Sequence, residues 1–486
     1  MEISLNNFRI KELKKNLIIY LTVIAILLPG YIINQWIILP FYAIAVFWGI
    51  QRKLKRLIIL YIVWIFSSGG AYQYDLLGVD QANPLIVYYK YLLITIIFIC
   101  FLISKKRKNV FIKNIFKLAT LFLITIFLSA VINLINPLGI ISFFLVYLQW
   151  YLFGMVLIFS DLDIHYLKSL ISLVFVIVLF NAIFGIIQSV ILPIKPAPNS
   201  YDLHRADVAS GMLGIWRSQI LTSLCLVASS YFIFRLLFNI GKHNLIYSSL
   251  FLLQPLLSES KTAIYTGTSF ILLSIVLLYL SSKNEMHYSI WKLIFVGVFL
   301  GTMLFFFNIF SQNLYETNID SNVLVESFFN KTNISDYKKI VAYINAVSII
   351  APSGNAGILF GIGPSQLKNG ASSEYENYIS KAGFDLNSEK KLSTVEQGFT
   401  DMNTIISDIG LMGIFIFLLV IIKLIRILYK NLWIKQDINR KILILIAFEL
   451  LVILSFNSFY LAGWSEPLYF IPFWIVIAFI SDLQSI

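Results

Sequence analysis

The chain has 486 residues, of which 59% are hydrophobic and only 13% are charged, and its mean hydropathy is +0.83. Soluble domains usually carry about 25% charged residues, so this composition excludes an ordinary soluble protein and predicts an integral membrane protein. The net charge of +12 excludes an acidic chain. Its basic residues gather in short loops between apolar runs, which indicates membrane topology and anionic lipid contact, not nucleic-acid binding.

Apolar runs follow one another along the chain, most of them near the length of roughly 20 residues that crosses a bilayer. They predict an all-α polytopic membrane protein with about 14 transmembrane helices. The expected spans are 17–33, 36–50, 57–74, 85–103, 115–135, 138–160, 167–192, 213–238, 245–258, 262–281, 290–310, 404–422, 442–461 and 468–482. The chain then divides into residues 1–310 with eleven spans, a large polar loop at 311–403, and residues 404–486 with three spans.

Lys and Arg concentrate in every second loop, most clearly at residues 52–56, 105–108 and 423–441. The positive-inside rule makes those loops cytoplasmic and places both termini in the cytoplasm. The basic N-terminus followed by an apolar run is similar to a signal peptide, but a second span follows at once without a small-residue cleavage site. We therefore expect an uncleaved first helix.

The polar segment 311–403 falls on the external side in this topology. It contains 7 Lys, no Arg and 10 acidic residues, so it is not a basic binding surface. One large external loop late in a many-span chain suits an enzyme that acts on a lipid-linked substrate at the outer membrane face. The sequence contains no P-loop, GxGxxG or HExxH motif, and we expect no cofactor.

Few cations face the external side outside this loop, and three of them are candidate phosphate ligands. Arg205 lies in a loop, and Arg217 lies at or just within the next span, where a charge is costly and usually has a task. Arg side chains match phosphate oxygens two at a time. Arg205 could instead pair with Asp207, and either Arg could extend to lipid headgroups. Lys261 belongs to a polar hinge at 258–262, and the alternative is that this hinge is only an ordinary hairpin turn.

Within the loop, residues 335–350 have the three-to-four-residue apolar spacing of an amphipathic helix, with Ser335 as a plausible N-cap. Lys339 and Tyr343 lie one turn apart on a common face. The alternative is a helix on the membrane surface with solvated lysines.

Three carboxylates are candidate general bases. Glu396 and Asp401 lie where the loop enters the next span, and Glu466 lies in the short last external loop. Asp401 could instead cap the span, because negative charge is favoured at a helix N-terminus. The same alternatives apply to Asp408.

Glu449 lies in the middle of a span, where a buried charge is costly, so we expect it to be protonated or paired and give it no role in chemistry. Only His204 of the four histidines faces outward. A metal site needs several ligands, and the sequence contains no cluster with that spacing.

Several of these segments occur in an order that resembles a known family. They are Arg205-x5-Gly211 in an external loop, the hinge 258–262, Lys339-x3-Tyr343-x2-Ala346, the run Leu-Phe-Gly-Ile-Gly-Pro at 359–364, and the run Ile-Gly-Leu-Met-Gly at 409–413. This pattern resembles the Wzy-type O-antigen and capsular polysaccharide polymerases and the related O-antigen ligases. The resemblance covers roughly residues 200–425.

The resemblance implies a GT-C-like glycosyltransferase in the bacterial inner membrane. It would polymerise oligosaccharide repeat units carried on undecaprenyl diphosphate at the outer face. Its expected partners are that lipid-linked oligosaccharide, membrane lipids and a chain-length regulator protein. It implies Asp401 as the general base, followed by Glu396 and Glu466 as further candidates. It implies that four cations bind the diphosphate without a metal: Arg205, Arg217, Lys261 and Lys339. Tyr343 and Asn403 would contact the sugars.

The chain departs from the family pattern at three places. The hinge carries Lys261 and the loop helix carries Lys339 and Tyr343, where the family usually has Arg and an Arg-x3-Trp pair. The ligases have a His-Asn pair where this chain has Met402 and Asn403. Since methionine cannot accept a proton, this favours a polymerase over a ligase. A third alternative, a lipid-linked oligosaccharide flippase, would have two similar halves and short loops, which the sequence lacks.

Overall fold

A computed structural model gives the structure of the protein. It describes residues 10–32, 35–67, 84–104, 110–135, 148–190, 211–213, 218–238, 243–257, 260–282, 354–364, 401–434, 437–460 and 466–483, with single residues or triplets at 137, 140, 141, 143, 240, 296–298, 300–302, 305, 347, 350 and 464.

The regular elements in these ranges are helices, which confirms the all-α prediction. The first half contains α1 (Ile10–Ile32), η1 (Gln35–Ile38), α2 (Leu39–Ile50), α3 (Leu54–Ser67), α5 (Pro84–Ile103), α6 (Val110–Ile132), α8 (Gln149–Phe159), α9 (Ile164–Val190) and η4 (Gly211–Leu213). The second half contains α10 (Ser218–Leu237), α11 (Asn244–Leu257), α12 (Lys261–Ser282), α16 (Gly354–Phe360), α19 (Asp401–Leu432), α20 (Ile438–Tyr460) and α21 (Pro467–Leu483).

Six described helices are long and apolar enough to cross a membrane, and they identify a membrane-embedded protein. They are α6, α9, α10, α12, α19 and α20. Further apolar helices of 10 to 17 residues lie in α1, η1–α2, α5, α8 and α21. The predicted total of about 14 spans and the GT-C-like fold remain predictions.

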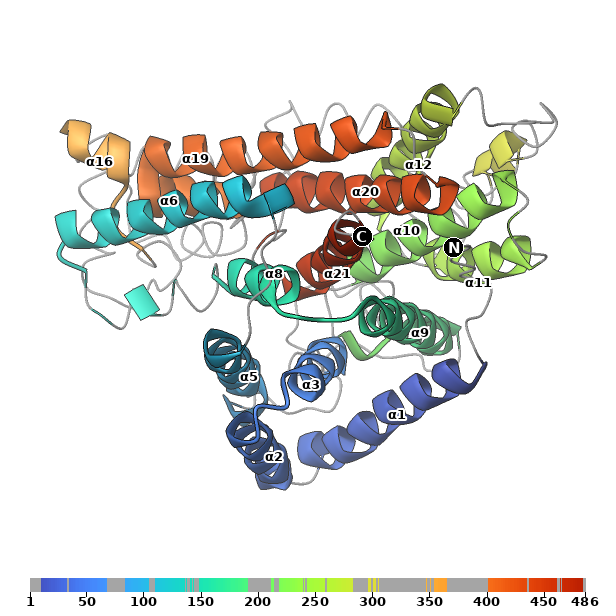
Figure 1. Ribbon diagram of the computed structural model, residues 1–486, viewed down its shortest axis with the longest axis horizontal. Coiled ribbons are helices and arrows are strands. Elements are labelled where there is room, and N and C mark those ends of the chain that lie inside the picture. The colour runs from blue at the N-terminus through green and yellow to red at the C-terminus, as the bar shows by residue number, and fades with distance from the viewer. Residues whose placement is uncertain are drawn as a thin grey trace.

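The helices pack around α10, which contacts α9, α11, α12, α20 and α21. In Figure 1, α6, α19 and α20 run alongside one another along the long axis of the molecule, and α21 lies below them between α8, α9 and α20. The N-terminal helices α1, α2, α3 and α5 form a separate group at the bottom of the view, joined to the rest mainly through α9 and α8. Aromatic rings fill the junction of α8 and α21, where Trp150 stacks parallel to Trp474 with ring centres 6.4 Å apart.

The C-terminal end of α19 marks one membrane–water interface. Tyr429 and Trp433 are exposed there with ring centres 5.9 Å apart, and Lys430 lies in the last turn. Aromatic rings and basic residues favour the headgroup level. Residues 411–432 then rise about 33 Å at 1.5 Å per residue, which is enough to cross a hydrocarbon core about 30 Å thick. Residues 401–409 precede the non-helical Gly410 and fold back against this segment, since a Cβ at Gly413 would lie 3.4 Å from the Ile405 side chain.

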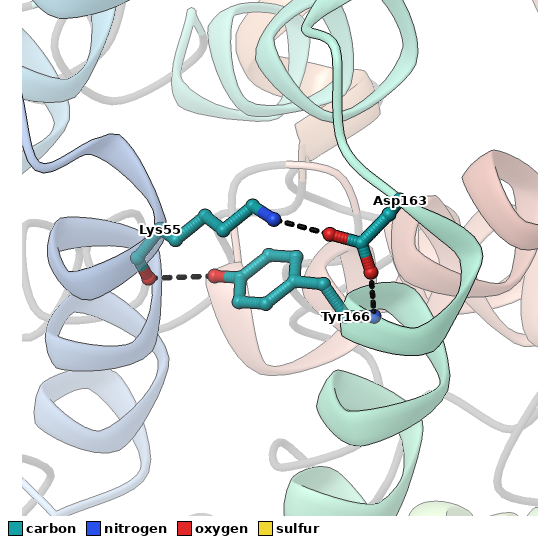
Figure 2. A network of polar contacts seen from close by, with 3 residues as sticks. All are labelled: Lys55, Asp163 and Tyr166. Atoms are coloured by element: carbon teal, nitrogen blue, oxygen red, sulfur yellow. Dashed lines mark hydrogen bonds and ion pairs between the residues drawn. The ribbon is translucent and has the colours of Figure 1, made fainter.

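A polar network ties α3 to the start of α9 (Figure 2). The Lys55 ammonium forms an ion pair with Asp163. The other Asp163 oxygen accepts a hydrogen bond from the Tyr166 backbone N–H at 2.8 Å, and the Tyr166 hydroxyl donates to the Lys55 carbonyl at 2.6 Å. The network fixes where the chain enters α9, beside the basic segment 52–56.

Much of the external loop predicted at 311–403 lies outside the described residues, including the expected helix at 335–350 apart from Val347 and Ile350. Within the loop, the run at 359–364 lies in α16 and in a turn at 361–364 that follows it. Helix α19 begins at Asp401, three residues before the predicted span, because hydropathy alone does not detect its polar first turn.

The Lys55–Asp163 pair predicts a small acid-dependent loss of stability. The hydrogen bond from Lys55 lowers the pKa of the Asp163 carboxyl below its usual value. The stability that the ion pair contributes is therefore present above the ordinary carboxyl pKa, and it is lost as the pH falls through the lowered pKa of Asp163. Both side chains are about half exposed, so Asp163→Asn should cost less than about 1 kcal/mol.

Thermal unfolding in detergent across the acidic range measures this effect. Asp161→Asn, a change at an exposed carboxyl of the same loop, is the control. Wild type and Asp161→Asn should lose more stability on acidification than Asp163→Asn. Identical profiles for all three proteins would show that the ion pair contributes nothing.

Candidate functional site

The first two turns of α19 carry polar side chains that the fold buries. Asp401 is 2% exposed, and Asn403, Ser407 and Asp408 are fully buried. Asp401, Thr404 and Asp408 are three and four residues apart, so they form one stripe along the helix. Because burial of polar groups is costly unless they are bonded, this stripe marks a specific site.

Helix α19 is interrupted at Gly410, which has φ 73° and ψ −166°. An α-helix would pair the carbonyls of Ser407 and Asp408 with N–H groups four residues further on. Instead, the Ser407 carbonyl accepts from the Ile362 N–H at 2.8 Å, and the Asp408 carbonyl accepts from the Gly363 N–H at 3.1 Å. The turn after α16 thus replaces hydrogen bonds that the interrupted helix lacks.

Two glycines allow the turn and the interrupted helix to approach this closely. A Cβ at Gly361 would lie 2.4 Å from the backbone carbon of Asp408, and a Cβ at Gly410 would lie 2.6 Å from the backbone nitrogen of Gly361. Both glycines also have positive φ, which other residues rarely adopt. Neither position can therefore hold a larger residue without moving backbone.

Helix α6 completes the site with two side chains. The Ser129 hydroxyl donates to the Asp408 carbonyl at 2.8 Å. The Asn133 amide donates to the carbonyls of Ser129, at 2.8 Å, and Gly361, at 3.1 Å. We call the assembly of residues 361–364, residues 401–410 and these two α6 side chains the helix-break site.

The two carboxyls of the helix-break site occupy different electrostatic positions. Asp401 is the first residue of α19, where the helix dipole stabilises negative charge. Asp408 lies about 10 Å further along at 1.5 Å per residue, next to the break. A carboxylate at a helix start can accept a proton from a polar substrate, and the hydrogen bonds across the break hold the surrounding backbone in a fixed shape.

The structure brings together only part of the predicted residue set. Asp401 and Asn403 both lie in the helix-break site. Lys261 is the first residue of α12, but its side chain lies outside the described residues. Five further predicted residues lie wholly outside them: Arg205, Arg217, Lys339, Tyr343 and Glu396.

Glu466 lies elsewhere, at the start of α21. Its Oε1 accepts a hydrogen bond of 3.4 Å from the Leu468 N–H, as a helix cap does. Its neighbour Trp464 packs edge-on against Phe417, with ring centres 6.0 Å apart. This contact places the loop that carries Glu466 beside the middle of α19.

The sequence reading missed Ser129 and Asn133. Their only signal was a pair of polar residues four positions apart at the end of an apolar run. Gly361 and Gly410 were noted as parts of two separate motifs, and their contact was not expected.

Two further features of the described structure bear on binding sites, a cavity and the potential metal ligands. A cavity of about 50 Å³ between α9, α10, α20 and α21 is lined by apolar side chains only, among them Phe175, Ala228 and Leu450. Among the described residues, no group of three His, Cys, Asp or Glu side chains could hold a metal ion.

The chain matches none of the protein-family models, curated proteins or solved structures with which it was compared.

The close contact at Gly361 predicts that the helix-break site tolerates no side chain there. Gly361→Ala should destabilise the protein by roughly 1–3 kcal/mol more than Gly354→Ala, the range typical of overpacking. Gly354 is the matched control, since its φ of 69° is similar but an added Cβ would meet no atom within 4 Å. Thermal unfolding of both variants in detergent measures the difference, and equal losses would mean that only backbone strain matters at Gly361.

Proposed function

We propose that the protein is a glycosyltransferase that polymerises oligosaccharide repeat units carried on undecaprenyl diphosphate at the outer face of the bacterial plasma membrane. The observation that carries the proposal is the helix-break site. In it, the run 359–364 of the family pattern donates backbone hydrogen bonds to Ser407 and Asp408, and Gly410 of the run 409–413 packs closely against Gly361. The site also contains two buried carboxyls, Asp401 and Asp408.

The depth of the site supports a substrate that is half lipid and half sugar. Residues 411–432 are long enough to cross the hydrocarbon core by themselves, so the break at Gly410 and the turn at 361–364 bound to it lie near the headgroup level on the side opposite Tyr429 and Trp433. The sugar–diphosphate end of a polyprenyl lipid lies at that level, while its chain remains in the bilayer. Irregular backbone at such a depth is tolerated only where protein covers it or where it lines a cavity, and interrupted helices often carry binding sites.

The proposed reaction moves the growing chain from one lipid to the next repeat unit. The bond between sugar C1 and the diphosphate oxygen breaks, and the acceptor hydroxyl oxygen bonds to C1. Asp401 takes the hydroxyl proton, a contribution of roughly 10²–10⁴-fold in rate. The leaving diphosphate keeps the bonding electron pair, and Arg205, Arg217, Lys261 and Lys339 would stabilise its charge.

The remaining proposed contacts concern the sugars and other proteins. Asn403, two residues from Asp401 in the first turn of α19, would hydrogen-bond a sugar hydroxyl. Tyr343 would stack on a sugar face, and Glu396 and Glu466 are the second choices as base. A chain-length regulator is the proposed protein partner.

Asp401→Asn tests the proposal in a deletion strain. We expect the stably expressed variant to leave single repeat units on the normal acceptor and to lose the polysaccharide ladder on a gel, because an amide cannot take the hydroxyl proton. Asp437→Asn is the matched control, since Asp437 also lies at the start of a helix, directly before Ile438 of α20, but is exposed. This control should restore the ladder.

Three results of the same gel would contradict the proposal. Full-length polymer left on its lipid carrier after deletion would indicate a ligase. Lipid-linked units that accumulate without reaching the outer face would indicate a flippase. A normal ladder with Asp401→Asn would remove Asp401 from the mechanism.

A further inference from the structure

Glu449 is a carboxyl buried in the middle of the membrane-spanning bundle. It is 1% exposed and lies on α20, about 16 Å of helix rise from Ile438. A hydrocarbon core about 30 Å thick places this carboxyl near its centre. An ionisable residue at that depth is costly and marks a functional site.

Hydrogen-bond geometry around Ser230 indicates the protonation state of Glu449. The Ser230 hydroxyl, on α10, contacts Glu449 Oε2 and also lies 2.8 Å from the Val227 carbonyl. A serine hydroxyl has one proton and can donate to only one of these oxygens, but it can also accept. Both contacts are full two-centre hydrogen bonds at the same time only if the carboxyl holds a proton and donates it to the Ser230 oxygen, since otherwise the two acceptors share one serine proton.

The second carboxyl oxygen adds an independent observation. Glu449 Oε1 and the Ser274 hydroxyl are both buried, and neither makes a hydrogen bond of normal geometry within the described part of the chain. Ser274, on α12, is nevertheless close enough to act on this carboxyl. An ionised Glu449 would be expected to draw in the Ser274 hydroxyl, because an unpaired buried charge is far costlier than an unpaired neutral oxygen.

No described ionisable group from the packed helices supplies a counter-charge at this depth. On α10, Arg235 hydrogen-bonds the Tyr231 hydroxyl, whose ring packs against Phe175 of α9. The other ionisable groups of the helices that pack against α20 are Cys225 on α10, Lys261, Tyr265 and Tyr279 on α12, Asp401, Asp408, Lys423, Arg426, Tyr429 and Lys430 on α19, and Tyr469 and Asp482 on α21. On α20 itself, Arg440 and Lys441 lie in the first turn. Besides burial, the groups that influence the protonation of the Glu449 carboxyl are the hydroxyls of Ser230 and Ser274.

We propose that Glu449, Ser230 and Ser274 form a proton-binding site in the membrane core, where three helices meet. In the protonated state Glu449 donates to Ser230, and Ser230 donates to the Val227 carbonyl. When the proton leaves to water, Ser230 turns to donate to Oε2 and Ser274 donates to Oε1. Proton release therefore tightens the contact of α12 with α20 and weakens the link of Ser230 to its own helix. The site is independent of the proposed sugar chemistry.

Infrared spectroscopy of the full-length protein in lipid bilayers tests the proposal directly. At neutral pH the wild type should show the C=O stretching band of a protonated carboxylic acid, and the isosteric Glu449→Gln should lack it. Ser230→Ala should retain the band at a shifted frequency, because the acceptor of the acid proton is gone. Asp161→Asn, which changes an exposed carboxyl, should leave the band unchanged.

Three outcomes would overturn the proposal. Identical carboxylic-acid regions in the wild type and Glu449→Gln would mean that Glu449 is ionised. A band that does not move in Ser230→Ala would place the proton away from that hydroxyl, and this comparison remains usable if Glu449→Gln fails to fold. Loss of the band on addition of Na⁺ but not K⁺ at constant pH would identify a metal-cation site built from the same three oxygen donors.

Discussion

The structure depends on one constraint, which is that the backbone hydrogen bonds lost where a buried helix is interrupted must be replaced by other parts of the protein. A buried peptide group without a partner costs about as much as a lost hydrogen bond. At the break in α19, the N–H groups of Ile362 and Gly363 and the hydroxyl of Ser129 meet the carbonyls of Ser407 and Asp408. Three segments far apart in the sequence are thereby fixed against one another.

The same need for partners applies to two buried carboxyls in different surroundings. Asp401 lies at the start of a helix, and the polar stripe that follows it is covered by packed chain. Glu449 lies in the middle of its helix, where the helix end is too far away to assist it. The Ser230 hydroxyl of α10 contacts it instead.

Sequence reasoning predicted what depends on local composition. The expected spans at 115–135, 442–461 and 468–482 agree closely with α6, α20 and α21, because apolar length and flanking charge are properties of a single segment. The bond from Asn133 to Gly361 joins residues 228 positions apart, and no periodicity indicates such a pairing. The sequence did not predict the break at Gly410 either, because glycine is common inside transmembrane helices and does not by itself indicate a break.

Helix α10 has a consequence for how the protein is made. It is the least apolar of the six long helices, and its polar side chains bond to two partners. Thr222 and Ser229 pair with Gln254 and Ser248 of the adjacent α11, whereas the Gln219 amide pairs with Asn457 of α20. During synthesis α10 and α11 can therefore enter the bilayer as a hairpin that already satisfies Thr222 and Ser229. Gln219 meets Asn457 only after some two hundred further residues have been translated, so this interval is when the nascent chain has most need of a chaperone in the membrane.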